Sequence, residues 1–250
     1  MKDSKEYLNK KAFFDKILTI YGRNSVFEAL SDEGIKIYKL HLSNSNRDAK
    51  ILDDMKTFAK DRGVEVVYHD KVSLSRISKN AKQDQGVALD IEMDYIGEDF
   101  FKDKDSYKVI ALDGVSNPQN IGMIIRSATA GDIDAIILPT KRKEQISPLV
   151  IKSSVGTIFK MPIIKTQNLA QTLKSLQKDG ASVYTLEANS PNVYNKESLN
   201  LKSIFVLGNE SDGVSKEVSS IRDKSLCIPM NRGVESLNVA ISGALLSFLD

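Results

Sequence analysis

The stretch SNPQNIGMIIRSATAGDIDAIIL, residues 116–138, decides the fold of the second half of the chain. The apolar run VIAL (109–112) precedes it, a helical pattern fills its middle, and a second apolar run, AIIL (135–138), ends it. Two apolar runs joined through a helix predict a strand–helix–strand unit of a parallel sheet. The loop before the helix lacks the pattern G-x-G-x-x-G, which argues against a dinucleotide-dependent dehydrogenase.

The same alternation of strands and helices extends on both sides of this unit. Before it, we expect strands at residues 37–43, 64–69 and 85–93, with helices at 25–32, 48–63 and 72–81. After it, we expect strands at 158–165, 182–188, 203–210 and 225–230, with helices at 147–158, 168–180 and 236–250. The alternation predicts an α/β fold for both halves, and in the second half it predicts a parallel sheet with helices on both faces.

The acidic, irregular stretch YIGEDFFKDKDSY (95–107) divides the chain. We interpret it as a linker, because neither a strand nor a helix period continues through it. The predicted organisation is an N-terminal extension (1–18), a small α/β domain (19–95), a linker (96–106) and a larger α/β domain (107–250). Asn24 or Ser25 is expected to cap the first helix of the small domain.

Composition excludes some classes of protein and leaves others open. The formal net charge is +2, which by itself does not predict a nucleic-acid-binding protein. The single cysteine, Cys227, excludes an intramolecular disulfide and fits a reducing compartment. No apolar run has the length of a membrane span, so we expect a cytoplasmic protein. The two histidines, His41 and His69, have no metal-ligand spacing, and we predict no metal site.

Three motifs at predicted strand ends carry polar side chains. In the first, Asn120 is a candidate helix cap, Gly122 permits a close backbone approach, and Arg126 lies one helical turn later. An arginine there is suited to a phosphate or carboxylate, although a solvated arginine is the simpler interpretation. In the second, the strand 203–207 runs into Gly208, Asn209 and Glu210, where a turn capped by Ser211 or Asp212 would explain every residue except Glu210.

The third motif follows the last predicted strand. IPM (228–230) precedes ESLNVA (235–240), in which Ser236 is a candidate cap and Asn238 belongs to the first turn of an apolar helix. A helix that is apolar nearly all round is buried in its domain or against a partner subunit. Ligands collect at the carboxyl ends of the strands in open α/β sheets, so the three motifs together predict one binding site.

These motifs, NPQNIGMIIRSA, FVLGNESDGVS and IPMNRGVESLNVA, resemble the three signatures of the SpoU family of RNA ribose 2′-O-methyltransferases, in the SPOUT superfamily. The resemblance covers residues 107–250. Residues 19–95, from YGRNSVFEAL to QGVALDIEM, resemble the L30e-like substrate-binding domain of the same family. The resemblance implies a C-terminal trefoil knot that forms the S-adenosylmethionine pocket, and a homodimer.

The resemblance also implies roles for individual residues. The residues expected to line the cofactor pocket are Leu207, Gly208, Ile228, Met230, Ser236, Leu237 and Asn238. Those expected in catalysis are Asn120, Arg126, Glu210, Ser236 and Asn238. RNA contacts are expected from Arg23, Asn24 and Arg47 in the small domain and from the basic loop with Lys141 and Arg142. Many relatives carry a glycine where this chain has Arg232. Either the glycine has shifted by one position, to Gly233, or the cofactor loop has an altered geometry in which an exposed Arg232 adds an RNA contact.

The substrate is predicted less sharply than the reaction. The separate L30e-like domain favours 23S ribosomal RNA, with guanosine as the target, and thus a role in rRNA processing or antibiotic resistance. A tRNA methyltransferase and a non-catalytic RNA-binding protein are the alternatives; intact Asn120, Arg126, Glu210 and Ser236 argue against the latter. Arg126 is expected to stabilise the developing alkoxide as a cation, because a guanidinium rarely loses its proton.

Overall fold

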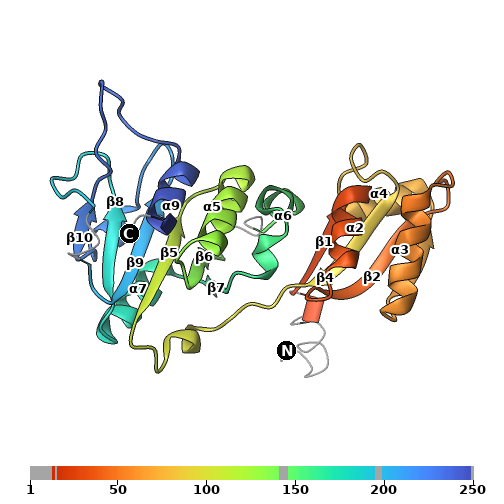
Figure 1. Cartoon of the computed structure of the whole chain (residues 1–250), viewed down its shortest axis with the longest axis horizontal. Helices are drawn as coiled ribbons and strands as arrows, with labels where there is room; N and C mark the ends of the chain where they lie inside the picture. The colour runs from red at the N-terminus through yellow and green to blue at the C-terminus, as the bar shows by residue number, and fades with distance from the viewer. Residues whose placement is uncertain (1–12, 15, 141–145, 195–198, 249–250) are drawn as a thin grey trace, which may run out of the picture. The chain divides into compact units, whose positions relative to one another are not determined.

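The computed structural model describes residues 13–14, 16–140, 146–194 and 199–248. The chain forms two compact units, Met1–Asp94 and Tyr95–Asp250, and each is described by itself (Figure 1). The predicted basic loop residues Lys141 and Arg142, and most of the predicted N-terminal extension, lie outside the described residues. The extension ends earlier than predicted, since the first strand begins at Ile17.

The first unit is built on a mixed four-stranded sheet. Its strands are β1 (Ile17–Tyr21), β2 (Lys36–Ser43), β3 (Glu65–His69) and β4 (Val87–Glu92), in the order β1-β4-β2-β3. Only β2 and β3 are parallel, because β4 runs antiparallel to both β1 and β2. The sheet of this unit is therefore mixed, because the segment before β4 brings the chain back in the opposite direction.

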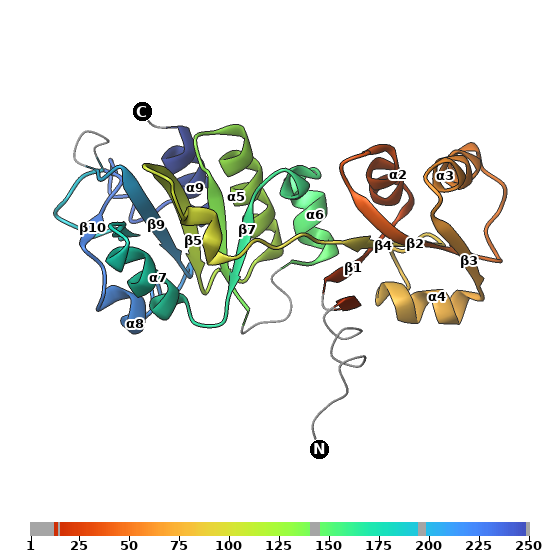
Figure 2. The same ribbon diagram turned by 90° about the horizontal axis from the view of Figure 1, so that it is seen from below.

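Three helices cover the first sheet. Figure 2 shows α2 (Arg23–Ser31) and α3 (Lys50–Asp61) on one face and α4 (Lys71–Ser78) on the other. The predicted cap at Asn24 or Ser25 is wrong, because α2 already begins at Arg23 and has no side-chain cap. Instead Asp70 caps α4, where its carboxylate accepts hydrogen bonds from the Val72 and Ser73 amides.

The second unit is built on a six-stranded sheet in which every pairing is parallel, as predicted. The strand order is β10-β8-β9-β5-β6-β7. The strands are β5 (Tyr107–Asp113), β6 (Ala135–Pro139), β7 (Ile163–Thr166), β8 (Ser182–Leu186), β9 (Lys202–Gly208) and β10 (Lys224–Leu226). The chain builds from β5 outward to β7 and then crosses to the other side, so the order reverses next to β5. Open α/β sheets bind ligands at such a reversal.

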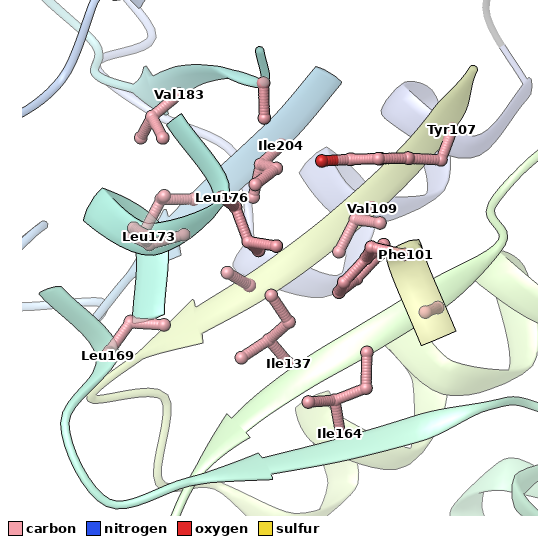
Figure 3. Packing of buried hydrophobic residues seen from close by; sticks show 14 of the residues in the cluster. Phe101, Tyr107, Val109, Ile137, Ile164, Leu169, Leu173, Leu176, Val183 and Ile204 are labelled. Atoms are coloured by element: carbon pink, nitrogen blue, oxygen red, sulfur yellow. The ribbon is translucent and has the colours of Figure 1, made fainter. Parts of the chain in front are cut away.

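Helices cover both faces of the second sheet (Figure 2). α5 (Pro118–Ala130), α6 (Pro148–Ser154) and α9 (Val239–Phe248) pack together on one face, with the short helix η2 (Thr157–Phe159). α7 (Leu169–Lys178) and α8 (Lys216–Ser219) lie on the other face. Figure 3 shows Leu169, Leu173 and Leu176 of α7 packed over the strands, where the apolar runs found in the sequence form the core.

The segment predicted as a linker, residues 96–106, is part of the second unit. The Ile96 amide donates to the Ile163 carbonyl at 2.9 Å, beside β7. Phe101, in the short helix η1 (Glu98–Phe101), is 6% exposed and contacts Tyr107 in the core shown in Figure 3. The sequence did not show this packing, because Ile96, Phe100 and Phe101 are few apolar side chains in a stretch that is otherwise acidic. Burial raises the pKa of Tyr107 to about 12.

Every helix among the described residues is too short or too polar to span a membrane.

Near the C-terminus, the Asp132 amide after α5 donates to the carbonyl of Ser247 in α9 at 2.8 Å, so the last helix is bonded to the first crossover of the sheet. The trefoil knot stays a prediction.

Candidate active site

The first motif follows β5 and opens α5. Asn117 caps the helix, since its side-chain oxygen accepts from the Gln119 amide at 2.9 Å, and Pro118 occupies the first turn. The prediction that Asn120 is the cap is therefore wrong. Asn120 is the third residue of the helix and is 8% exposed. Because the Asn117 side chain caps the helix, the side-chain amide of Asn120 is available to other partners.

Gly122 has a different role from the one predicted. It lies within α5, and a Cβ there would come within 2.5 Å of the Ser153 Cβ and 2.6 Å of the Val150 carbonyl oxygen. The glycine therefore lets α5 pack closely against α6, rather than opening the helix start to a ligand.

The second motif is a tight loop at the end of β9. Asn209 and Gly213 exchange two backbone hydrogen bonds of 2.9 Å, and the Asn209 side chain accepts from the Ser211 amide at 2.8 Å. A Cβ on Gly208 would lie 2.2 Å from the Gly213 carbonyl carbon, so this position requires glycine. The turn is thus organised by Asn209, not capped by Ser211 or Asp212 as the simpler interpretation had it.

The register of the sheet places these two motifs side by side. Asp113, the last residue of β5, pairs with Gly208, the last residue of β9. The Asn209 side chain donates to the Gly114 carbonyl at 2.9 Å, and Asp113 accepts from the Ser215 amide at 2.7 Å. Asp113 was missed in the sequence, and Asn209 was named there without a role. The available signal was a short polar side chain at the end of each apolar strand.

One polar network joins all three motifs. The Asn120 side-chain nitrogen donates to Glu210 Oε1 at 2.6 Å, and its oxygen accepts from the Asn238 side chain at 3.2 Å. Asn238 in turn accepts from the Ala240 amide at 2.8 Å, at the start of α9. Asn238 therefore has the capping role that was predicted for Ser236. Each amide orients the next, so the network fixes the relative positions of three loops that are distant in sequence.

Arg126 lies on the exposed side of α5. Among the described residues, its guanidinium makes no hydrogen bond or ion pair, and no described contact joins it to the Asn120–Glu210–Asn238 network. An uncommitted guanidinium presents its full set of donors to a ligand. The structure thus joins three of the five predicted catalytic residues by hydrogen bonds. The other two, Arg126 and Ser236, are exposed and take no part in this network.

The predicted cofactor residues fall in two segments. Leu207 is buried, with its side chain against Gly243 of α9, and Gly208 forms the loop described above. The remaining residues lie between β10 and α9, where Ile228, Met230 and Leu237 are partly buried and Ser236 and Asn238 are exposed.

The segment between β10 and α9 is irregular and contains one turn. In the described residues 228–237, the backbone bond from the Val234 amide to the Asn231 carbonyl spans Arg232 and Gly233, both with positive φ (59° and 72°). The other main-chain groups of this segment lie outside helices and strands, beside the half-buried apolar side chains of Ile228 and Met230. Such a segment can surround an adenosine with main-chain donors, acceptors and apolar side chains, so the residues fit the predicted cofactor.

The predicted RNA-binding residues of the first unit gather at one end of its sheet. The Arg23 amide donates to the Gln85 side chain at 2.9 Å and its Nε to the Gln85 carbonyl at 3.3 Å. The Asn46 side chain, next to Arg47, donates to the Gly86 carbonyl at 2.8 Å. Asn24 and Arg47 are exposed. The start of α2, with Arg23, and the loop that carries Arg47 are therefore both bonded to the segment before β4.

A second polar network crosses the first unit. Thr19 donates to Asp90 at 2.6 Å, His41 Nε2 lies 3.1 Å from Asp90, and His41 Nδ1 lies 2.9 Å from His69 Nε2. Burial and the nearby His41 lower the pKa of His69. Burial alone would raise the pKa of Asp90, but hydrogen bonds from His41 and Thr19 outweigh it and lower that pKa. Among the described residues, no cluster of three or more His, Cys, Asp and Glu side chains has metal-site geometry.

Two protein families match the chain. The SpoU rRNA Methylase family matches residues 107–248, and the family described as RNA 2′-O ribose methyltransferase substrate binding matches residues 19–95. Curated relatives are called putative TrmH family tRNA/rRNA methyltransferases. The one from Staphylococcus epidermidis is 32% identical over 92% of this chain and 94% of its own length. One from Staphylococcus aureus is 32% identical over 92% and 93%.

Solved structures share the fold of the whole chain. The AdoMet-bound rRNA methyltransferase from Sinorhizobium meliloti has a TM-score of 0.70 at 22% identity, over 97% of this chain and 88% of its own. The SpoU methyltransferase AviRb from Streptomyces viridochromogenes, in complex with AdoMet, has a TM-score of 0.74 at 17% identity, over 98% and 91%. The predicted α/β fold of the SPOUT type is confirmed.

Proposed function

We infer the function from the family: this chain belongs to the SpoU rRNA Methylase family and is an RNA methyltransferase. We propose that it transfers a methyl group from S-adenosylmethionine to a ribose 2′-hydroxyl of 23S ribosomal RNA, with guanosine as the target nucleoside. The observation that carries the proposal is the Asn120–Glu210–Asn238 network. It gathers three polar loops at the edge of the sheet where β5 and β9 end, which is where open α/β sheets bind ligands.

The cofactor would be held by the loop at Gly208 and by the irregular segment 228–238. When bound, S-adenosylmethionine supplies a methyl group on a sulfonium, which is already a strong electrophile. The chain's own residues therefore act on the acceptor. The Asn120–Glu210–Asn238 network holds the loops in place, so that the acceptor oxygen and the methyl group meet in line. Alignment of this kind contributes several kcal/mol, of the roughly 7–11 kcal/mol that proximity can supply.

Arg126 is the residue proposed to assist the acceptor oxygen. A ribose 2′-hydroxyl is a weak nucleophile, and negative charge develops on its oxygen as the new bond forms. The Arg126 guanidinium is exposed and uncommitted among the described residues, so it can pair with the adjacent phosphate and stabilise that charge. The guanidinium acts here as a cation and hydrogen-bond donor rather than as a base. The hydroxyl proton passes to phosphate or water.

Ribosomal RNA is favoured over tRNA by the presence of a complete substrate-binding unit, which matches the RNA 2′-O ribose methyltransferase substrate-binding family. The names of the curated relatives include both RNAs, so tRNA is the second candidate. Either substrate places the protein in the cytoplasm.

We also propose a homodimer. α9 buries Val239, Ala240 and Leu246 against its own unit, yet Ile241 is 47% and Phe248 58% exposed on the same helix. On the neighbouring helix α5, Met123 is 46% exposed. A second copy would cover these apolar side chains. Light scattering of the purified chain measures its mass directly, and an Ile241→Glu variant should shift that mass from dimer to monomer.

The proposal is tested by methyl transfer from labelled S-adenosylmethionine to unmodified 23S rRNA and to tRNA in parallel. Arg126→Ala should abolish transfer, while Lys174→Ala, which removes an exposed basic side chain from α7 on the opposite face of the sheet, should leave it unchanged. Label in tRNA alone would replace the rRNA assignment. Transfer that survives in Arg126→Ala would contradict the role given to Arg126. A chain that does not bind the cofactor would contradict the whole proposal.

A further inference from the structure

The first unit carries a cavity of about 160 Å³ beside its edge strand β3. Buried Leu42 and Leu52 form part of its lining, and Tyr68 of β3, which is 54% exposed, forms another part. Leu42 and Tyr68 are paired in the sheet register, so both side chains lie on the face covered by α3. The cavity therefore has an apolar floor and an exposed aromatic wall.

The rim of this cavity is polar and partly uncommitted. Arg47 and Asp48, in the loop between β2 and α3, are exposed and make no hydrogen bond or ion pair among the described residues. On α3, Lys56 is paired with Asp53 at 3.1 Å, so these two charges offset each other. The charged groups left to a ligand are therefore the Arg47 guanidinium and the Asp48 carboxylate.

The loop that carries Arg47 and Asp48 is held in place before any ligand arrives. Its Asn44 amide donates to the His69 carbonyl at 2.8 Å, beside Tyr68. The Asn46 side chain donates to the Gly86 carbonyl, and the Ser43 amide donates to the same carbonyl at 2.9 Å. A site fixed in this way spends little binding free energy on ordering its own residues.

We propose that this cavity binds one unpaired nucleotide of the RNA substrate, with its base against Tyr68 and its phosphate at Arg47. The inference rests on the proposed function, because it requires RNA as the ligand. Bases of single-stranded RNA stack on exposed aromatic rings, and arginine pairs with phosphate through its planar fork. Asp48 accepts hydrogen bonds, so it favours a base with an exocyclic amino group, which cytosine has and uracil lacks.

Binding of short fluorescent oligocytidylate and oligouridylate to the full chain tests this proposal. Tyr68→Ala should weaken binding about tenfold, the typical loss when a base-stacking aromatic is removed, whereas Tyr68→Phe keeps the ring and should bind normally. Tyr38→Ala is the matched control, because Tyr38 is an exposed tyrosine of the same sheet that does not line the cavity. Asp48→Ala should remove the preference for cytosine over uracil.

A second readout concerns the phosphate. Arg47→Ala should lower the slope of log affinity against log salt concentration by about one, as expected for the loss of one phosphate contact. Tyr68→Ala should leave that slope unchanged. If Tyr68→Ala binds both oligonucleotides as tightly as Tyr38→Ala does, the cavity does not hold a base and the inference is overturned.

The two proposals fail in different ways. The Arg126→Ala variant should lose methyl transfer and keep the Tyr68-dependent binding. Methyl transfer that persists beside a negative result at Tyr68 would remove only the nucleotide cavity. Oligonucleotide binding through Tyr68 without methyl transfer to any RNA would keep the cavity and remove the enzymatic proposal.

Discussion

The two polar networks of this chain are built in opposite ways. In the first unit, Thr19, Asp90, His41 and His69 each come from a different strand, and the contacts follow the strand order β1-β4-β2-β3 across the sheet. In the second unit, Asn120, Glu210 and Asn238 lie at helix starts and in a loop, and none belongs to a strand.

This difference separates stability from function. A row of side chains across a sheet needs only the correct register, because neighbouring strands lie about 4.8 Å apart everywhere. A network between loops needs the complete topology, because Asn120 and Asn238 meet only when β9, β10 and α9 are all in place. The first network should therefore hold its unit together, and the second should position the reacting groups.

Among variants that test the comparison of the two networks, Asn120→Ala should have the largest effect. It leaves Glu210 and Asn238 without their shared partner, so the three loops lose their fixed arrangement. We expect kcat/KM for methyl transfer to fall about 100-fold, the loss associated with a misplacement of about 1 Å. The control is Gln119→Ala, which removes an exposed amide at the preceding position. Equal kinetics for the two variants would show that the network does not position the reaction.

Asp90→Ala should destabilise without slowing the chemistry. The substitution removes the acceptor of both Thr19 and His41 in a largely buried setting, which typically costs about 1–3 kcal/mol. We expect the free energy of unfolding of the first unit to fall by that amount, measured by urea denaturation, with kcat for methyl transfer unchanged. Glu92→Ala is the control on the same strand. The Glu92 Oε1 lies 4.0 Å from Lys16 Nζ, so this variant should lower the free energy of unfolding much less. A drop in kcat would break the distinction between the two networks.

Arg232→Gly should raise stability slightly. Arg232 has a φ of 59°, a conformation that costs a side-chain-bearing residue about 1–2 kcal/mol, although the added freedom of glycine in the unfolded chain offsets part of the gain. We expect the free energy of unfolding of the second unit to increase by up to about 1 kcal/mol in thermal denaturation. A decrease would indicate that the Arg232 side chain makes contacts that stabilise the loop.

The pH dependence should be the smallest effect. The folded-state pKa of His69 is lowered by burial and by His41, so folding favours its neutral form. The stability that this pKa difference contributes is fully present above the unfolded-state pKa of about 6.5. It is lost as the pH falls through the lowered folded-state pKa of His69. The lowered pKa of Asp90 acts in the same direction below about pH 4.

Because the His69 ring is only partly buried, water screens its interactions and the slope should be shallow. Unfolding of the first unit, followed between pH 7 and pH 5 in the full chain, checks this, with His69→Asn as the variant that should flatten the slope. The titratable groups that act on His69 are His41, Asp70 and Lys39. A stability that rises on acidification would contradict the assigned direction.

The sequence predicts the elements well and the contacts between them poorly. The strands and helices of the second unit follow from apolar runs, which bury themselves wherever they fall in the chain. The caps were misplaced because Asn117 and Asn120, or Ser236 and Asn238, lie within three residues of each other and any of them has the required chemistry. Only the geometry of the helix start decides between them.

The partners of Asn120 could not be predicted either. Glu210 and Asn238 lie 90 and 118 positions later in the chain, and their approach depends on the register that pairs Asp113 with Gly208. A motif shows that a polar residue is present, but not which residue it contacts. The mixed sheet of the first unit was missed for a similar reason, since strand direction is set by connections whose path the local pattern does not reveal.

The position of β9 between β5 and β8 has a consequence for biosynthesis. The ribosome delivers β5, β6, β7 and β8 first, and the place between β5 and β8 stays empty until β9 emerges. Asn238 is synthesised later still, after β10. The Asn120–Glu210–Asn238 network therefore assembles only once the slow, long-range pairing of β5 with β9 is complete.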